Sequence, residues 1–169
     1  MKLLLIDAYA LIYRSYYAFI RNPRVNSKGM NTSAIFGFIN SLDDALRRLT
    51  PTHAAIAFDP AGPTFRHEAF PEYKAQREKT PEDIHASEPY IRRLIEARRI
   101  PLLEVARYEA DDVIGTIATQ AAQEQFDVYM MTPDKDYGQL VTDRIFQFRP
   151  RHGGDYETMG TAEVLAKYG

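Results

Sequence analysis

Short, wholly apolar runs separated by helical patterns constrain the fold of this chain more than any other feature. The run "KLLLID" (residues 2–7) holds four consecutive apolar residues without alternation, which is typical of a strand buried on both faces. Similar runs are "THAAIAFD", "IPLLEV", "FDVYMMTPD" and "RIFQF", at residues 52–59, 100–105, 126–134 and 144–148. We therefore expect five short strands, the second and fourth ending at Asp59 and Asp134.

Helical patterns lie between these strands. In residues 31–49, apolar side chains recur at helical spacing behind a candidate cap at Thr32 or Ser33. Residues 80–99 place Pro81 at the expected first helical position, and Pro89 is expected to bend or interrupt that helix. Another helix is expected to begin near residue 110. Alternating strands and helices predict an α/β fold with a mostly parallel central sheet flanked by helices.

Composition narrows the classes of function. The length of 169 residues favours a single domain over residues 1–169, and no apolar run approaches the roughly 18 residues of a membrane span. The absence of cysteine excludes disulfides and thiolate metal sites and is compatible with a cytoplasmic location. A net charge of −2 is not that of a generally basic nucleic-acid-coating domain, so a bound polyanion requires a local basic patch or metal ions.

Acidic residues follow several of the predicted strands. Because ligands bind beyond the carboxyl ends of the strands in open α/β sheets, we expect these acids to converge at one edge. Few cations lie near them in the sequence: Lys135 stands between two of them, and Arg107 precedes another by two residues. The set comprises Asp7, Asp59, Glu109, Asp111, Asp112, Asp134 and Asp136.

So many carboxylates in one cleft would raise one another's pKa unless a cation neutralises them. Ligands that are all oxygen atoms favour Mg²⁺ or Mn²⁺, and their number favours two ions, an arrangement suited to in-line attack on a phosphodiester. Taken singly, an acid at a strand end or in the first turn of a helix is more simply a capping residue. The joint occurrence at several strand ends favours the metal site.

A basic and aromatic segment spans residues 65–79, "FRHEAFPEYKAQREK". Lys74 and Arg77 are three residues apart and would share one face of a helix, where both could contact phosphate. Tyr73 offers a ring for stacking against a base. A solvated helix of mixed charge remains the alternative, because glutamates are interleaved with these cations.

Five longer stretches carry a resemblance to a known family. They are "LLLIDAYALIYRSYYAF", "TSAIFGFINSL", "FDPAGPTFRHEAFPEYKAQREKTPEDI", "YEADDVIGTIA" and "TPDKDYGQLV", beginning at residues 3, 32, 58, 108 and 132. Together they resemble the N-terminal 5′-nuclease domains of bacterial DNA polymerases I, within the flap endonuclease family. The resemblance runs from Lys2 to the end of the chain.

The resemblance implies a PIN-like (Rossmann-like) domain with a helical arch near residues 64–99. It implies a 5′-3′ exonuclease or flap endonuclease of DNA replication and repair that acts on DNA with 5′ flaps or nicks and on RNA primers. It also implies two Mg²⁺ (or Mn²⁺) ions in a longer parent protein, joined there to a polymerase domain.

The resemblance also implies roles for single residues. Asp7, Asp59 and Asp111 match catalytic ligands of the first ion, with Asp112 nearby. Glu109, Asp134 and Asp136 match ligands of the second ion, partly through water. For the substrate, the matching residues are Lys74 and Arg77, which would hold the scissile phosphate, with Tyr73 beside them, and Arg14 in the first helix.

The chain departs from the family pattern in two places. It ends at Gly169, before a further pair of aspartates and a helix–turn–helix module that follow in relatives, so we expect weak or no activity from these residues alone. Pro133 stands where relatives carry a small residue, and we expect a local change of backbone there.

Two other functions are compatible with parts of the pattern. A non-catalytic nucleic-acid-binding module could keep the same fold, although repelling carboxylates near phosphate would serve it no purpose. A phosphatase with an aspartyl-phosphate intermediate needs a second aspartate two residues after the first, where this chain has Tyr9.

Overall fold

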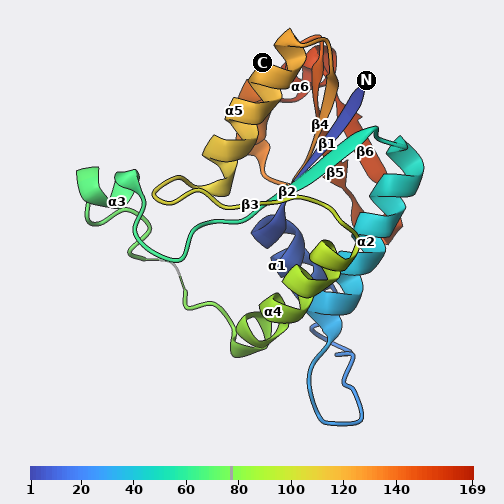
Figure 1. The fold of residues 1–169 in the computed structure, drawn as a ribbon, viewed down its shortest axis with the longest axis vertical. Coiled ribbons are helices and arrows are strands. Elements are labelled where there is room, and N and C mark those ends of the chain that lie inside the picture. The colour runs from blue at the N-terminus through green and yellow to red at the C-terminus, as the bar shows by residue number, and fades with distance from the viewer. Residues whose placement is uncertain (77) are drawn as a thin grey trace.

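A six-stranded sheet with helices on both faces forms the molecule in a computed structural model that describes residues 1–76 and 78–169 (Figure 1). The strand order is β3-β2-β1-β4-β5-β6, with β6 antiparallel to β5 and every other pair parallel. The predicted α/β class with a mostly parallel sheet is confirmed. The strands are β1 (Lys2–Asp7), β2 (His53–Ala57), β3 (Leu102–Leu103), β4 (Asp127–Met131), β5 (Ile145–Pro150) and β6 (Tyr156–Met159).

The helices form a layer on each side of this sheet. One side is covered by α1, α2 and α4, which pack on one another, and α5 packs on the other side against β1, β2 and β4. Figure 1 shows α5 and α1 on opposite sides of the strands. The helices are α1 (Ala8–Ala18), α2 (Ser33–Leu49), α3 (Phe65–Ala69), α4 (Glu82–Ala97), α5 (Ala110–Gln123) and α6 (Thr161–Tyr168), with short 3₁₀ turns η1 (Lys135–Leu140) and η2 (His152–Gly154).

Strand β1 lies between the two layers. Its alternate residues Leu4 and Ile6 belong to the core beneath α1, α2 and α4, whereas Leu3 and Leu5 belong to the core beneath α5. Because both faces of the strand are covered, every position must be apolar, which explains the absence of alternation in the sequence.

Helices α1 and α2 approach each other closely at Gly37. A Cβ atom added there would lie 2.7 Å from the Cβ of Ser15 in α1. Ser15 is itself buried, so neither helix can accept a larger side chain at this crossing without moving.

The strands end earlier than the sequence predicts. Strand β2 ends at Ala57 rather than Asp59, β4 ends at Met131 rather than Asp134, and β3 has only two residues. Asp59 and Asp134 each lie beside a proline, Pro60 and Pro133, which has no backbone N–H for a ladder. Both acids lie in the connections beyond their strands. Strand β6 was not anticipated.

Helix α4 differs from the prediction at Pro81, and of the two outcomes expected at Pro89 the interruption does not occur. Pro81 caps the helix instead of occupying its first turn, and α4 continues through Pro89 without interruption. Pro89 has no N–H to donate to the carbonyl of His85, four residues earlier. Both residues are exposed, so water can donate to this carbonyl instead.

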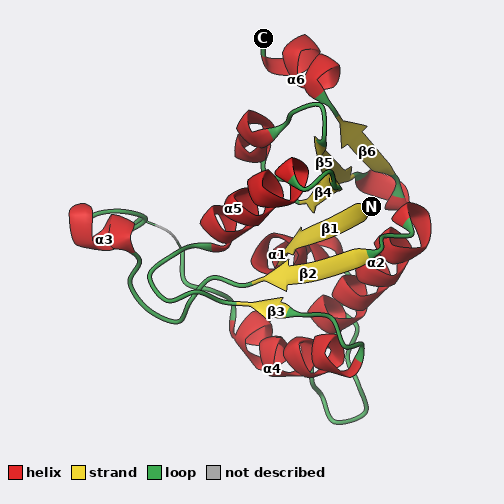
Figure 2. Ribbon diagram, turned by 45° about the horizontal axis from the view of Figure 1, so that its top comes forward, coloured by secondary structure: helices red, strands yellow, loops and turns green. Residues whose placement is uncertain are grey.

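The expected helical arch over residues 64–99 is only partly helical. A five-residue α3 is followed by turns before α4 begins at Glu82, and Lys74 lies in a turn with φ 57°, outside any helix. The expected helical face shared with Arg77 therefore does not form at Lys74; Arg77 itself lies outside the described residues. Figure 2 shows α3 standing away from the sheet, on the side toward which β1, β2 and β3 point.

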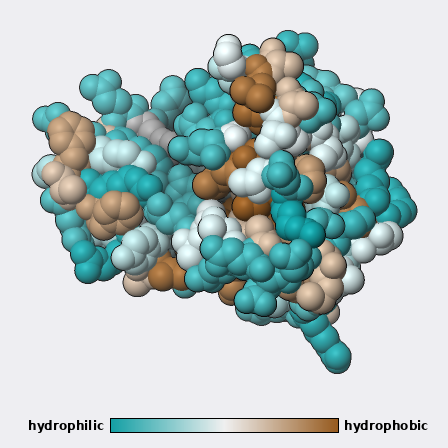
Figure 3. Space-filling model, turned by 90° about the horizontal axis from the view of Figure 1, so that it is seen from above, coloured by the Kyte–Doolittle hydropathy of each residue, from teal (hydrophilic) through white to brown (hydrophobic). Residues whose placement is uncertain are grey.

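The face shown in Figure 3 is mostly hydrophilic, with apolar residues in small groups rather than one broad patch. Among the residues that the structure describes, no helix has the length and apolar character needed to cross a membrane.

Candidate metal and nucleic-acid site

The acids gather at the point where the order of the strands reverses. The chain runs from β1 outward to β2 and β3, and it then returns to place β4 on the other side of β1. This reversal of strand order opens a crevice beyond the carboxyl end of β1. Asp7 ends β1 at this crevice. A hollow of about 770 Å³ there is lined by five of the acids singled out in the sequence, namely Asp7, Asp59, Glu109, Asp111 and Asp134.

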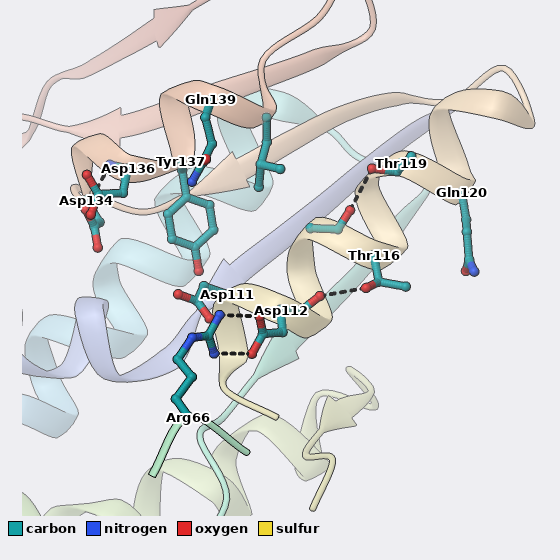
Figure 4. A pocket seen from close by; sticks show the side chains of 12 residues that line it. Arg66, Asp111, Asp112, Thr116, Thr119, Gln120, Asp134, Asp136, Tyr137 and Gln139 are labelled. Carbon is teal, nitrogen blue, oxygen red and sulfur yellow. Dashed lines mark hydrogen bonds and ion pairs between the residues drawn. The ribbon is translucent and has the colours of Figure 1, made fainter. Parts of the chain in front are cut away.

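A second hollow, of about 590 Å³, continues on the side of α5 and η1 (Figure 4). It is lined by Asp112 and Asp136, and it shares Asp111, Asp134 and Tyr137 with the first hollow. The two hollows therefore meet at these three shared residues. All seven acids singled out in the sequence line one hollow or the other.

Four of the acids accept backbone hydrogen bonds, and one of these runs from the N–H of Glu109 to Asp112 at 3.1 Å. Asp7 caps α1 by accepting the N–H of Ala10 at 3.1 Å, and Asp134 accepts the N–H of Asp136 at 3.0 Å at the start of η1. Asp59 accepts the N–H of Ala110 at 2.7 Å, which joins the end of β2 to the start of α5. Capping thus accounts for the location of these side chains and leaves further oxygen lone pairs for a ligand.

Two of the acids form ion pairs with the segment around α3. Arg66 contacts Asp112 with both Nη atoms, at 2.6 and 2.7 Å (Figure 4). Lys74 Nζ lies 2.7 Å from Oε1 of Glu109, and the hydroxyl of Tyr73 donates to Oε2 of Glu109 at 3.1 Å. The sequence neighbourhood predicted no such pairing, because these cations lie 46 and 35 residues away along the chain.

Glu109 is the most enclosed of these acids, with 5% of its surface exposed. A buried carboxylate needs a partner, and Lys74 supplies one from a backbone conformation that L-residues rarely adopt, at φ 57°. Tyr73 is therefore turned toward Glu109, where its hydroxyl has a partner.

The remaining acids carry charge that the described cations compensate less. Burial raises the pKa of Asp7 to about 6, and the nearby Asp59 acts in the same direction. Burial, Asp112 and Glu109 also raise the pKa of Asp111. By contrast, the hydrogen bonds from Arg66 lower the pKa of Asp112. Among the described residues, the carboxylates of Asp7 and Asp111 thus lack a cation partner of their own, whereas those of Asp112 and Glu109 are paired with cations of the α3 segment.

Tyr137 occupies the junction of the two hollows and is 3% exposed. Its hydroxyl donates to Oδ2 of Asp7 at 3.1 Å. Burial and the neighbouring carboxylates raise the pKa of Tyr137 well above its ordinary value, so the phenol stays protonated.

Arg14 does not join the acids. Its guanidinium donates to the carbonyl of Arg151 at 2.5 Å, and Arg14 is not among the residues that line either hollow.

The acids provide oxygen donors only, which fits Mg²⁺ or Mn²⁺ better than zinc. Within residues 1–76 and 78–169, no three acidic or histidine side chains already surround a common point. Binding of an ion therefore requires carboxylates to reorient, most of all Glu109 and Asp112, which hold their own cations.

Two residues of the site were not assigned from the sequence. Arg66 stands in the basic segment, but nothing in the pattern shows that it reaches Asp112 rather than solvent. Tyr137 stands inside "DKDYGQ" with no signal for its hydroxyl, because its contact with Asp7 spans 130 residues of the chain.

Comparison with known proteins identifies the family of this chain. A family model described as "5'-3' exonuclease, N-terminal resolvase-like domain" matches residues 2–169. The chain belongs to this family.

Relatives of this exonuclease family are found in many bacteria. DNA polymerase I of Bacillus caldotenax is 41% identical over 170 residues, which cover 99% of this chain and 19% of the relative. DNA polymerase I of Treponema pallidum (strain Nichols) is 44% identical over 143 residues, which cover 85% of this chain and 14% of the relative. The chain thus spans about a fifth or less of the length of these relatives.

Solved structures share the fold of this exonuclease domain. The T5 D15 protein co-crystallised with metal ions has a TM-score of 0.71 at 17% identity, covering 99% of this chain and 61% of that one. The catalytic core of Rad2 in complex with a DNA substrate has a TM-score of 0.56 at 17% identity, covering 98% of this chain and 49% of that one. The PIN-like fold predicted from the sequence is confirmed.

Proposed function

We propose that this chain is the catalytic part of a metal-dependent 5′-3′ exonuclease or flap endonuclease. The observation that carries the proposal is the gathering of acids from separate connections around one crevice, with Lys74 and Arg66 on its rim. Membership of the exonuclease family and the metal-bound and DNA-bound fold neighbours support it.

Asp7, Asp59 and Asp111 would hold one Mg²⁺ or Mn²⁺ ion, with Asp112 nearby, and Glu109, Asp134 and Asp136 would hold a second. Such ions supply a water of lowered pKa and neutralise charge on the reacting phosphodiester. For a second ion, Glu109 must release Lys74, and we propose that this lysine then contacts phosphate. We propose the same phosphate role for Arg77, and substrate contacts for Tyr73 and Arg14.

The substrate is proposed to be DNA with a 5′ flap or nick, and RNA primers as a further class, within replication and repair. Since the relatives are DNA polymerases I that extend far beyond the matched residues, we propose a parent that also carries a polymerase domain.

Cleavage of a 5′-labelled flap oligonucleotide tests this function. We expect slow release of the labelled flap in Mn²⁺ or Mg²⁺ and none in chelator, with Asp59→Asn or Asp111→Asn lowering the rate at least 100-fold. Asp127→Asn is a matched control, because Asp127 lies at the opposite end of β4 and pairs there with Arg144 at 2.9 Å. Cleavage that persists in chelator would contradict the proposal, and DNA binding without cleavage would favour a non-catalytic module.

A further inference from the structure

Tyr137 lies where the two acid-lined hollows meet. It projects from η1, and Figure 4 shows its ring directed toward Asp111. Its ring also belongs to the apolar cluster beneath α5, with Ala110 and Ile114. A phenylalanine would fill the same space, so only the hydroxyl group distinguishes a role in the site from a role in packing.

The hydroxyl has a defined partner. It donates to Oδ2 of Asp7 at 3.1 Å, while Oδ1 of Asp7 accepts the N–H of Ala10 at 3.1 Å. Each carboxylate oxygen is thereby held by one donor, and this fixes the rotation of the carboxylate group. Because a carboxylate oxygen offers about two lone-pair sites, each oxygen of Asp7 retains one for a cation.

We propose that Tyr137 is a positioning residue whose hydroxyl holds the Asp7 carboxylate in the orientation that binds the divalent cation. The inference rests on the proposed function, since it assumes that Asp7 is a metal ligand. Partners of metal ligands act in this way by restricting the ligand before the ion arrives, and their loss commonly weakens binding about 10- to 100-fold.

Binding of Mn²⁺ alone tests the proposal, measured from the electron paramagnetic resonance signal of the free ion with the 169-residue chain and no substrate. We expect Tyr137→Phe to raise the dissociation constant about tenfold. Tyr129→Phe is the matched control, because Tyr129 is a partly buried tyrosine of β4 that lines neither hollow and lies near Lys2 and Asp127. This control should bind Mn²⁺ as the parent chain does.

A double-mutant cycle with Asp7→Asn separates positioning from a general effect on the fold. If Tyr137 acts through Asp7, Tyr137→Phe should change Mn²⁺ affinity less than twofold once Asp7 is Asn. An equal loss in both backgrounds would overturn the proposal, as would unchanged affinity of the single variant Tyr137→Phe. Failure of the unaltered chain to bind Mn²⁺ would instead overturn the proposed function, and the positioning role with it.

Discussion

Asp7 is the acid at which burial and ionisation conflict most. Its pKa rises from 3.8 to about 6 because the carboxylate is buried, so between these pH values the folded state binds more protons than the unfolded chain. The free energy of unfolding therefore falls as the pH rises through this window, and it stays lower above it. A bound cation would remove this cost by compensating the charge.

We expect Asp7→Asn to stabilise the metal-free chain at pH 7.5, by roughly 1–3 kcal/mol. The amide can still accept the N–H of Ala10, and its own N–H can donate to Tyr137. Near pH 3, below the unfolded pKa of 3.8, most of this advantage should vanish, because the carboxyl is then mostly neutral in both states. Thermal unfolding in chelator at the two pH values measures this, and a variant less stable than the parent at pH 7.5 would contradict it.

Arg66 links the α3 segment to the start of α5 through its paired contacts with Asp112. We expect Arg66→Gln to lower the free energy of unfolding by about 1 kcal/mol, since a partly buried carboxylate loses a bidentate partner. Thermal unfolding in chelator measures the loss.

Arg107→Gln provides the control for this change, because the Arg107–Glu68 pair is well exposed, at 62% and 51% of the two side chains. It should change stability by less than about 0.5 kcal/mol. Equal effects of the two substitutions would show that the Arg66 pair is no stronger than a surface contact.

The crossing of α1 and α2 at Gly37 positions the helix that Asp7 caps. We expect Gly37→Ala to destabilise the fold by about 1–3 kcal/mol, because the added Cβ would lie 2.7 Å from the Cβ of Ser15. Gly115→Ala in α5 is the matched comparison: its added Cβ would meet only the tip of Leu140, at 3.3 Å, and alanine favours a helix. In denaturant unfolding, the free energy of unfolding of Gly37→Ala should be well below that of Gly115→Ala. The reverse order would contradict this packing.

The elements themselves were largely predictable, and their ends were not. Local pattern identified β1, α2 and α5 because apolar spacing alone defines a buried strand or a helical face. The end of β2 depends on where its neighbours stop pairing, and the continuity of α4 through Pro89 depends on which side of the helix faces water. Lys74 lies outside a helix, and its ammonium group contacts a buried carboxylate 35 residues away, a contact that local pattern cannot reveal.

At the scale of the whole molecule, the sequence predicted that the acids would converge, because parallel strands bring their carboxyl ends to one edge. It did not predict that Arg66 and Lys74 would form ion pairs with Asp112 and Glu109. Such contacts depend on how a long connection folds back toward the carboxyl ends of the strands, and the spacing of apolar residues does not indicate that. The crevice is therefore partly neutralised by the chain's own cations.

Anomalous diffraction from crystals soaked in Mn²⁺ would show whether these acids bind metal ions. We expect a peak in the crevice bounded by Asp7, Asp59 and Asp111, and Lys74 displaced from Glu109 wherever a second ion binds. A crevice without Mn²⁺ at millimolar concentration, with both ion pairs intact, would contradict the assignment of these acids as the metal centre of a nuclease.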